Sequence, residues 1–454
     1  MDITSLIPAF GGLVWTIAAF VVALSIIVAV HEYGHYIVGR WSGIKAEVFS
    51  IGFGPVLMSR VDRHGTQWQI AALPFGGYVK FLGDASAASD KAADDYDTLS
   101  DDQKRHTMHG APLWARAATV AAGPVFNFIL SILVFAGIMM LQGTAKEPVE
   151  VGALKPLPPG IERLEVGDVI LEVGGEEIPG TTELFEVLEE VEIGDGVPYA
   201  VERGGERIAI QAEYPFPPLI ETVQPRSAAI DVGLRQGDVI LSVDGAPIRA
   251  FRELQDLVTA SGGRPLQITV WRPAALDEAS PGGEKLEFVL APRSRDLPLP
   301  DGGFEKRWLI GMTGGLSFEP ARAAPGVGEA LGVGWSQMVF VMESSLSGLW
   351  HMITGAISTC NLSGPIGIAE TSGAAASAGT DSFFWFIAVL STAVGLLNLF
   401  PIPVLDGGHL VFHAWEAVTG QPPSDRALRV LMGIGLTLML SLMVFALGND
   451  IFCR

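Results

Sequence analysis

The sequence is poor in cysteine and in positive charge. Its 454 residues include two cysteines, Cys360 and Cys453, which are too few for a disulfide framework or for a metal site built from thiolates. Lysine and arginine number 29 against 50 aspartate and glutamate residues, so the formal net charge is −21. A protein that binds nucleic acid needs a basic surface, and we therefore expect no nucleic-acid partner.

Charged residues of either sign are also scarce. They make up 17% of the chain, while hydrophobic residues make up 49%, an apolar bias beyond that of an ordinary soluble domain. The first ten residues, MDITSLIPAF, contain no basic residue, and no signal-peptide cleavage site follows the first apolar run. We therefore expect this run to be a retained anchor in the lipid bilayer.

Four stretches are apolar enough to cross a membrane. A spanning helix needs about 20 apolar residues, and the sequence meets this at 12–38, 114–141, 383–405 and 427–447. A fifth stretch, 329–358, carries Glu343 and His351 among many Ser and Gly residues, and it suits an interfacial or packed helix better. The sequence thus predicts a multi-pass α-helical membrane protein with four transmembrane helices.

A soluble region with an internal repeat lies between the second and third spans. GDVILEVGGEEI at 167–178 recurs as GDVILSVDGAPI at 237–248, and each copy continues through a turn into a helical stretch. Such a repeat indicates duplicated domains. We expect two inserted α+β domains, and the predicted segments are 1–144 (N-terminal membrane part), 145–219 (first domain), 220–295 (second domain), 296–382 (connector with an amphipathic helix) and 383–454 (C-terminal membrane part).

The loop after the first span begins with alternating apolar and polar residues. Gly turns interrupt this pattern over residues 52–83, which predicts a membrane-associated β-hairpin. An edge strand of such a hairpin can hold an extended peptide by β-augmentation, and an ordinary cytoplasmic hairpin is the alternative. The residues that we expect to contact a substrate are Gly52, Phe53, Gly54, Pro55, Gly76, Gly77 and Tyr78.

The first span ends in HEYGH, residues 31–35. Residues four apart share a helix face, so His31 and His35 can bind one metal ion while Glu32 stands beside it. Ionisable groups at membrane depth usually face a protein interior or a water-filled pocket. Imidazole nitrogens suit Zn²⁺, and a catalytic zinc takes three protein ligands. The alternative is that the histidines only pack between helices.

The third ligand must come from another part of the chain. The candidates in or beside apolar segments are Glu343, Glu370, Asp381, Asp406, His409 and His413. If 329–358 does not cross the membrane, the first and third spans are parallel, and the end of the third span reaches the face of His31 and His35. Asp406, at that end, and His409, one helical turn later, both remain candidates on these grounds.

Five motifs in order along nearly the whole chain resemble the site-2 protease family of intramembrane zinc proteases, most closely its bacterial sigma-E-regulating branch. They are HEYGH, GFGP (52–55), AAGPVFN (121–127), the two PDZ-like repeats and NLFPIPVLDGGH (398–409). The resemblance implies that Asp406 of the LDG motif is the third zinc ligand and that Asn398 binds substrate or the oxyanion. Helix packing is the alternative for Asn398, and for Asn127 it is at least as plausible.

The resemblance also implies the reaction, a zinc metalloendopeptidase cutting single-span membrane proteins within or near their transmembrane segment. In such an enzyme Glu32 takes a proton from water and returns it to the leaving amine. The expected substrates are of the anti-sigma-factor type, with signal-peptide remnants as further candidates, after a first cut by a site-1-type protease. The PDZ-like domains would filter these substrates, although the first copy, which lacks the SAAxxxGL stretch of the second, suits a rigid spacer equally well.

Basic residues predict the orientation through the positive-inside rule. They flank the loops 41–113 and 407–426, which we therefore expect in the cytoplasm: Arg40, Lys45, Lys104, Arg105, Arg116, Arg426 and Arg429. The termini and the PDZ-like repeats then lie on the opposite side. The resemblance makes the membrane a bacterial inner membrane, with periplasmic PDZ-like domains and an active site towards the cytoplasm.

Two other functions remain open. A membrane-anchored PDZ scaffold without proteolytic activity fits the same architecture, but it has no need of Glu32. A metal transporter also places His and Asp in membrane helices. It should, however, carry further ionisable residues inside the second and fourth spans, and the sequence has none there after Arg116 and Arg429 at their starts.

Overall fold

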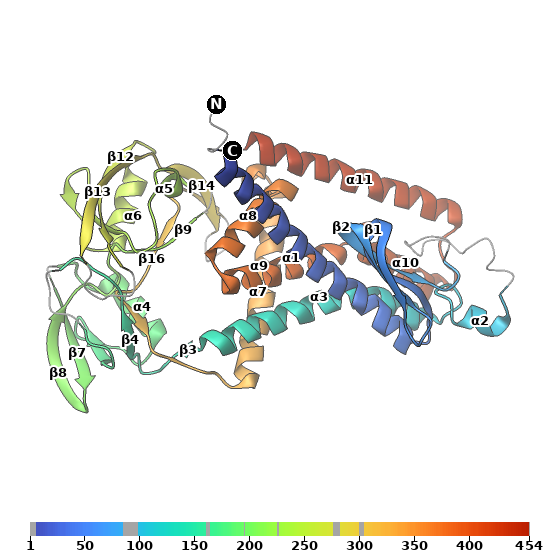
Figure 1. Cartoon of the computed structure of the whole chain (residues 1–454), viewed down its shortest axis with the longest axis horizontal. Coiled ribbons are helices and arrows are strands. Elements are labelled where there is room, and N and C mark those ends of the chain that lie inside the picture. Colours follow the sequence, from blue (N-terminus) through green and yellow to red (C-terminus); the bar gives the residue numbers. More distant parts are fainter. Residues whose placement is uncertain are drawn as a thin grey trace. The chain divides into compact units, whose positions relative to one another are not determined.

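The structure is a computed structural model that describes residues 6–84, 99–159, 164–194, 196–224, 227–275, 282–298 and 304–453. The chain forms two compact units, a helical one made of residues 1–138 and 326–454 and a β-rich one made of residues 139–325 (Figure 1). The β-rich unit is therefore an insertion between two parts of the helical unit.

Four helices in the described part of the chain are long and apolar enough to span a membrane, as the sequence predicts. They are α1 (Leu6–Trp41), α3 (Leu113–Gln142), α9 (Thr380–Asn398) and α11 (Asp425–Phe452). The other helices of this unit are α2 (Asp101–Arg105), α7 (Val327–Ile353), α8 (Pro365–Ala378) and α10 (Asp406–Thr419). Helix α7 corresponds to the ambiguous fifth stretch, and it is not one of the four candidate spans.

The third span ends earlier than predicted. Helix α9 stops at Asn398 because Pro401 and Pro403 lack the backbone N–H that a continuing helix needs. Residues 399–405 form turns, and Asp406 begins α10 instead of closing the span. The predicted continuous helix over 383–405 is therefore wrong, and Asn398 and Asp406 belong to different helices.

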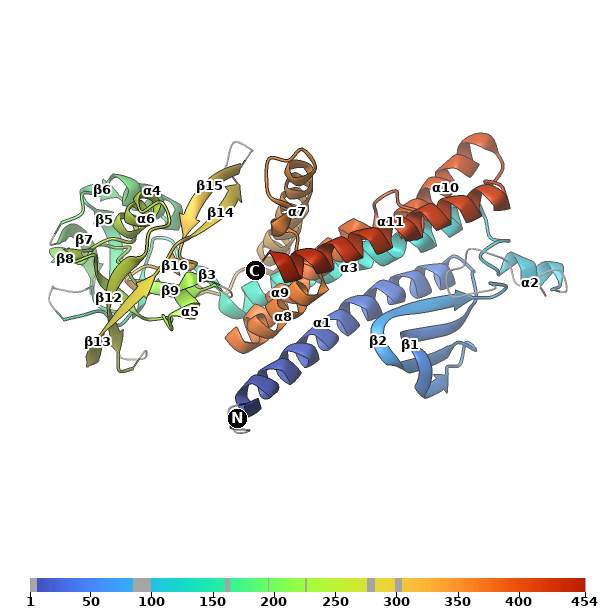
Figure 2. The ribbon, with the colours of Figure 1, turned by 90° about the horizontal axis from the view of Figure 1, so that it is seen from above.

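The loop after α1 folds into two long antiparallel strands, β1 (Ala46–Val61) and β2 (Gln67–Phe81). The pairing is more elaborate than a simple hairpin, since Phe49 is a register partner of both Trp68 and Val79. The start of β1 thus pairs with the first residues of β2 on one side and with its last residues on the other. Residues 77–81 therefore form an edge of this sheet. Figure 2 shows these strands beside the C-terminal half of α1.

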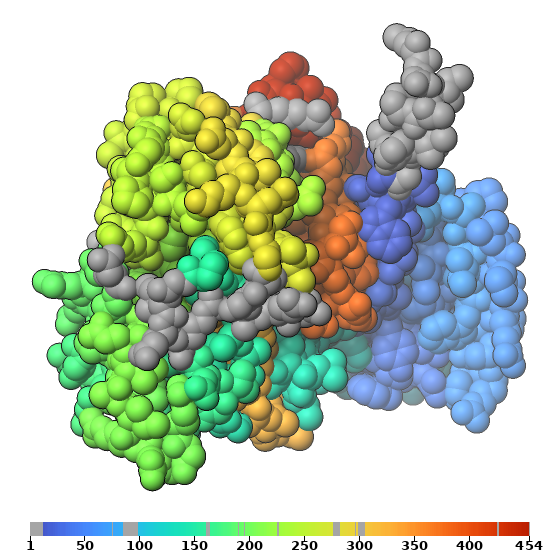
Figure 3. All heavy atoms as spheres, turned by 60° about the vertical axis from the view of Figure 1, so that its left-hand side comes forward, coloured from blue at the N-terminus to red at the C-terminus, as the bar shows by residue number. Residues whose placement is uncertain are grey.

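The β-rich unit contains two sheets with the same strand arrangement, β6-β5-β7-β8 and β11-β10-β12-β13. We call the first sheet with α4 (Thr181–Glu190) the first module and the second sheet with α6 (Phe251–Ala260) the second module. Their strands are β5 (Val169–Val173), β6 (Glu176–Glu177), β7 (Val197–Arg203), β8 (Glu206–Ala212), β10 (Val239–Val243), β11 (Ala246–Pro247), β12 (Leu266–Pro273) and β13 (Gly283–Leu290). Figure 3 shows both modules, in green and yellow-green.

The repeated Gly-Asp pair has a structural role in both modules. Asp168 and Asp238 are fully buried, and each accepts a hydrogen bond of 2.7 Å from an arginine on the neighbouring strand, Arg203 and Arg272 respectively. A buried carboxylate needs such a partner because burial removes its hydration. The repeat motif therefore stabilises the two sheets.

The second module is nested inside the first, which differs from the expected boundaries. Strand β9 (Ile220–Val223) pairs with β16 (Met312–Gly314), whereas β4 (Val151–Leu154) pairs with β17 (Phe318–Pro320). Phe318 belongs to the core of the first module and Ile310 to that of the second. Part of the expected connector 296–382 thus completes both modules, since Ile310 and Phe318 from this segment pack in the two cores.

The remaining strands are β3 (Thr144–Ala145), which pairs with β18 (Arg322–Ala323), and the hairpin of β14 (Arg293–Pro298) and β15 (Phe304–Leu309). The β3–β18 pair joins the two points at which the chain enters and leaves the β-rich unit. In the helical unit, Cys360 and Cys453 form a disulfide, which the sequence analysis did not predict.

Candidate metal centre

Three predicted ligands meet at one point. Nε2 of His31 lies 3.1 Å from Oδ2 of Asp406, and Nε2 of His35 lies 3.6 Å from Oδ1 of the same carboxylate. The two Nε2 atoms are 3.2 Å apart. Among the described residues, these three form the group of His, Cys, Asp and Glu side chains that is close enough to hold one metal ion.

The chemistry of this group fits zinc. Two imidazole nitrogens and one carboxylate are a ligand set found in catalytic zinc sites. Oδ2 of Asp406 is buried, and apart from the approach of Nε2 of His31 to 3.1 Å it meets no hydrogen-bond partner among the described residues. A buried carboxylate oxygen is costly to leave unsatisfied. A cation bound between the three side chains would satisfy it, so the residues present suit the metal.

Helix α3 orients both histidines from behind. Nδ1 of His35 lies 2.8 Å from the carbonyl oxygen of Thr119, which can only accept a hydrogen bond. The proton of this ring is therefore on Nδ1, and Nε2 keeps its lone pair for a metal. The carbonyl thus fixes the ring orientation in the way that partners behind metal ligands usually do.

Asn127 has the same position behind His31. Its amide nitrogen lies 3.2 Å from Nδ1 of His31, while its Oδ1 is buried without a hydrogen-bond partner among the described residues. The oxygen and nitrogen of an amide have nearly the same shape. A 180° rotation of the Asn127 amide would let its Oδ1 accept a hydrogen bond from Nδ1–H of His31. The resulting tautomer again leaves Nε2 free for a metal.

The AAGPVFN motif explains how α3 comes this close. A Cβ atom at Gly123 would overlap Nε2 of His35, and one at Gly34 of α1 would lie 2.9 Å from the carbonyl carbon of Ala122. Small residues allow membrane helices to approach closely. The sequence leaves packing and function equally open for Asn127, because its contact with His31 depends on the close approach of α1 and α3.

Glu32 lies beside the metal-binding residues, between α1 and the edge of β2. The backbone N–H of Val79 faces its carboxylate. Gly77, two residues earlier, has the room for this close approach, since a Cβ atom there would lie 2.9 Å from Val28 and 3.0 Å from Cγ of Glu32. The edge strand and the carboxylate are thus held against each other.

The site opens into a cavity of about 840 Å³. Glu32, Asn398 and Asp406 contribute to its wall near the metal-binding group, and Tyr78 contributes from β2. Further along, Arg116 of α3 makes a two-pronged ion pair with Glu416 of α10, with distances of 3.0 and 2.5 Å. The cavity therefore provides room for an extended peptide segment beside the reactive groups.

Two histidines of α10 also face this cavity. His409 and His413 both contribute to its wall, but neither belongs to the metal-binding group. Burial, together with the charge of Arg116, lowers the pKa of His413 to about 4. Of the other ligand candidates, Glu343 is exposed on α7.

The seven residues expected to contact substrate divide into two groups. Gly77 and Tyr78 line the cavity. The described wall does not include Gly52, Phe53, Gly54, Pro55 or Gly76. Phe53 instead stacks on Tyr78 with ring centroids 6.0 Å apart, and a Cβ atom at Gly76 would overlap the Phe53 ring. Phe53 therefore packs beside the edge strand and not in the described cavity wall.

Comparison with known proteins identifies the family of the chain. The model of Peptidase family M50 matches residues 19–442. A protein of Agrobacterium fabrum named "Putative zinc metalloprotease" is 34% identical over 451 residues, which cover 98% of both chains. The regulator of sigma-E protease RseP of Escherichia coli is 32% identical over 468 residues, which cover 96% of this chain and 98% of the relative. The chain therefore belongs to Peptidase family M50 and is a membrane-bound zinc metalloprotease.

Proposed function

We propose that this protein cleaves single-span membrane proteins within or near their transmembrane segments, with zinc held by His31, His35 and Asp406. The observation that carries the proposal is the position of these groups. They adjoin a cavity that also contains Glu32 and borders a β-strand edge, and α1, which bears HEYGH, is itself a candidate span. Zinc in this site supplies a Lewis acid that activates water near neutral pH.

Glu32 acts as the general base and then as the general acid. Its carboxylate takes a proton from the attacking water and delivers it to the leaving amine. The N–H of Val79 orients the carboxylate. Asn398, at the end of α9 and on the cavity wall, donates its amide protons to the substrate carbonyl as charge develops on the oxygen.

The edge of β2 holds the substrate in an extended form. A helical segment hides its carbonyl groups in internal hydrogen bonds, so it must unwind before attack. Residues 77–81 form an edge at the cavity, and pairing with this edge compensates for the lost helical hydrogen bonds. Tyr78 and the Phe53 ring stacked on it flank that edge.

The modules act as PDZ-like filters outside the cytoplasm, and the expected partners are anti-sigma-factor-type substrates already cut by a site-1-type protease. The RseP similarity supports an inner-membrane location. The disulfide between Cys360 and Cys453 supports the orientation independently, because disulfides persist in oxidising compartments such as the periplasm. It lies at the C-terminal end of α11, opposite Arg426 and Arg429, which favour the cytoplasm.

The test is cleavage of a single-span reporter by purified protein, with zinc measured in the same samples. Glu32→Gln should keep zinc and lose about 10²–10⁴-fold in turnover, the range for removal of a general base. Glu343→Gln, an exposed carboxylate on α7, is the matched control and should keep wild-type turnover. A wild-type protein that holds zinc but cuts no reporter, or a Glu32→Gln variant with full turnover, would contradict the proposal and favour a scaffold.

A further inference from the structure

Helix α11 contacts the rest of the helical unit at few places. Among its residues whose burial the structure describes, Gly435, Ala446 and Asp450 are buried. Most of its large apolar side chains, such as Leu438 and Val444, are exposed, as lipid-facing residues are in a membrane. These buried positions mark two close contacts of α11, one at Gly435 and one near its C-terminal end.

The first contact is with the turn that leads to Asp406. A Cβ atom at Gly435 would overlap the carbonyl oxygen of Pro403, so α11 lies directly against the backbone of that turn. Association of membrane helices relies on such small residues, because lipid provides little hydrophobic drive for packing. Any side chain at Gly435 must push α11 and Pro403 apart.

The turn itself is in an unfavourable conformation that needs support. Val404 has a φ of 90°, a left-handed value that a β-branched residue rarely adopts. Such a residue is strained and persists where the surroundings enforce its conformation. Val404 follows Pro403 directly and stands two residues before Asp406, so the packing at Pro403 bears on the position of the carboxylate.

The second contact fixes the other end of α11. The Asp450 carboxylate accepts hydrogen bonds from the backbone N–H groups of Gly364, Ile366 and Gly367, at 2.9, 2.9 and 3.1 Å. These groups are at the N-terminus of α8, where an anion is favoured. Asp450 stands 15 residues after Gly435, about 22 Å along the helix.

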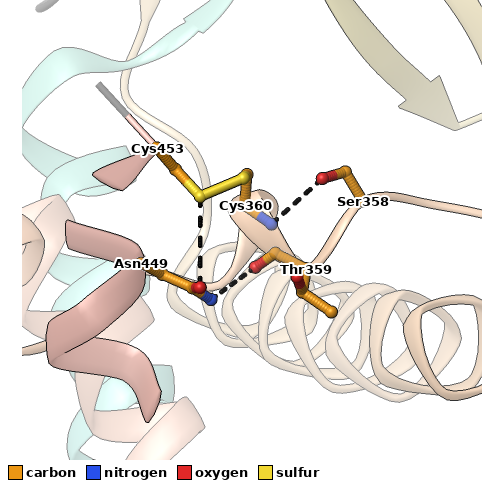
Figure 4. The surroundings of a disulfide bond; sticks show 5 residues. All are labelled: Ser358, Thr359, Cys360, Asn449 and Cys453. Atoms are coloured by element: carbon orange, nitrogen blue, oxygen red, sulfur yellow. Dashed lines mark hydrogen bonds between the residues drawn. A yellow bond between two sulfur atoms is a disulfide. The ribbon is translucent and has the colours of Figure 1, made fainter. Parts of the chain in front are cut away.

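The disulfide ties the same end covalently. Cys453 is bonded to Cys360, which lies in the short 3₁₀ helix Thr359–Asn361. Beside it the amide of Asn449 donates to the carbonyl oxygen of Thr359 at 2.8 Å (Figure 4). Figures 1 and 2 show α11 reaching from this end, near α8, to its other end beside α10.

We propose that α11 is a strut that holds the Asp406 turn in place, and that Gly435 is a positioning residue for the zinc site. The hydrogen bonds of Asp450 and the disulfide fix the position of α11 along its axis. The contact at Gly435 then fixes the position of Pro403. This proposal, that α11 is a strut, depends on the metal site of the proposed function. It predicts that changes in α11, none of them touching the metal ligands, alter zinc affinity.

The test is zinc affinity by competition with a chelator, with the visible spectrum of the cobalt-substituted protein as a second measurement. Gly435→Ala should lower zinc affinity by about 10–100-fold, the range for groups that support a ligand, and should change the cobalt bands. The matched control is Gly433→Ala on the same helix, because a Cβ atom there meets nothing within 4 Å. It should leave affinity and spectrum unchanged.

A second pair of variants covers the case in which Gly435→Ala fails to fold. Asp450→Asn, and separately Cys360→Ser with Cys453→Ser, release the far end of α11 without touching the turn. Both should lower zinc affinity, and Gly448→Ala, also in open space, should not. If folded Gly435→Ala has wild-type zinc affinity, α11 is not a strut for the Asp406 turn. The same conclusion holds if both Asp450→Asn and the double cysteine variant have wild-type zinc affinity. Absence of zinc from the wild-type protein would instead overturn the proposed function.

Discussion

The side-chain amide of Asn127 on α3 lies 3.2 Å from Nδ1 of His31 on α1. With its oxygen turned towards that nitrogen, the amide selects the tautomer that carries its proton on Nδ1. Nε2, which faces Asp406, then keeps its lone pair for a metal. Asn127→Ala should therefore lower zinc affinity by about 10–100-fold, measured by chelator competition. Asn127→Asp keeps an oxygen acceptor for the ring N–H and should retain more of the affinity than Asn127→Ala.

Ser131→Ala is the matched control for this change. Ser131 is also fully buried on α3, but its hydroxyl donates to the carbonyl oxygen of Ala388 and accepts from Thr392, so its hydrogen bonds are to α9. It tests whether loss of any buried polar group on α3 weakens zinc binding. Equal affinities in Asn127→Ala and Ser131→Ala would assign Asn127 to helix packing alone.

Gly77 separates substrate positioning from metal binding. A Cβ atom there would lie 2.7 Å from the carbonyl oxygen of Ser50 and within 3.0 Å of Val28 and Glu32. Gly77→Ala should shift the edge strand away from α1, weaken the contact of Val79 with Glu32, and reduce turnover of a single-span reporter about tenfold or more. Zinc content should not change.

The control for Gly77→Ala is Gly137→Ala on α3, which points into open space. It should cleave the reporter as the wild type does. If Gly77→Ala also keeps wild-type turnover, the edge of β2 does not take part in positioning the reaction.

His413 makes stability depend on pH. Burial lowers its pKa to about 4 from an ordinary value of 6.5, so between these values the unfolded chain binds a proton that the folded chain does not. Stability should therefore be complete above about pH 6.5 and fall as the pH drops towards 4, by at most about 3 kcal/mol. The thermal midpoint in detergent, measured from pH 4 to 7.5, tests this.

His413→Gln removes the titrating group while keeping a polar side chain. Its thermal midpoint should fall less steeply over the same pH range than that of the wild type. An unchanged slope would mean that other groups, such as carboxylates paired in the modules, cause the acid sensitivity.

Two of the three candidate ligands could be predicted from a local signal, because HEYGH places His31 and His35 on one helix face. Asp406 was named only through the resemblance of its LDG motif, and the structure brings it together with the two histidines. The number of spans was also predictable, since each depends only on a continuous apolar run.

What the sequence missed depends on contacts between distant segments. The contact of Asn127 with His31 requires the close approach of α1 and α3 at Gly34 and Gly123. The nesting of the modules requires Phe318 to pack with a core that begins at Val149. The early end of α9 is different, because Pro401 and Pro403 already indicate a helix end in the sequence, although the apolar run continues past them.

The nested arrangement gives a clean test of filtering. Thr144 and Ala323 are register partners in the β3–β18 pair, so the chain enters and leaves the β-rich unit at adjacent points. Residues 146–321 can therefore be replaced by a short Gly-Ser linker without stretching α3 or α7. Because all the metal-binding residues belong to the helical unit, this variant should keep zinc and cleave a reporter that lacks a periplasmic domain.

The same variant should lose selectivity if the modules filter substrates. A second reporter that keeps a folded periplasmic domain should be cut slowly by the wild type and at least about tenfold faster by the deletion variant, because the barrier to bulky substrates is gone. The ratio of the two cleavage rates is the measurement, and it cancels differences in protein yield. If the variant keeps zinc but no longer cuts the trimmed reporter, the modules take part in presenting the substrate, and a passive filter is the wrong description.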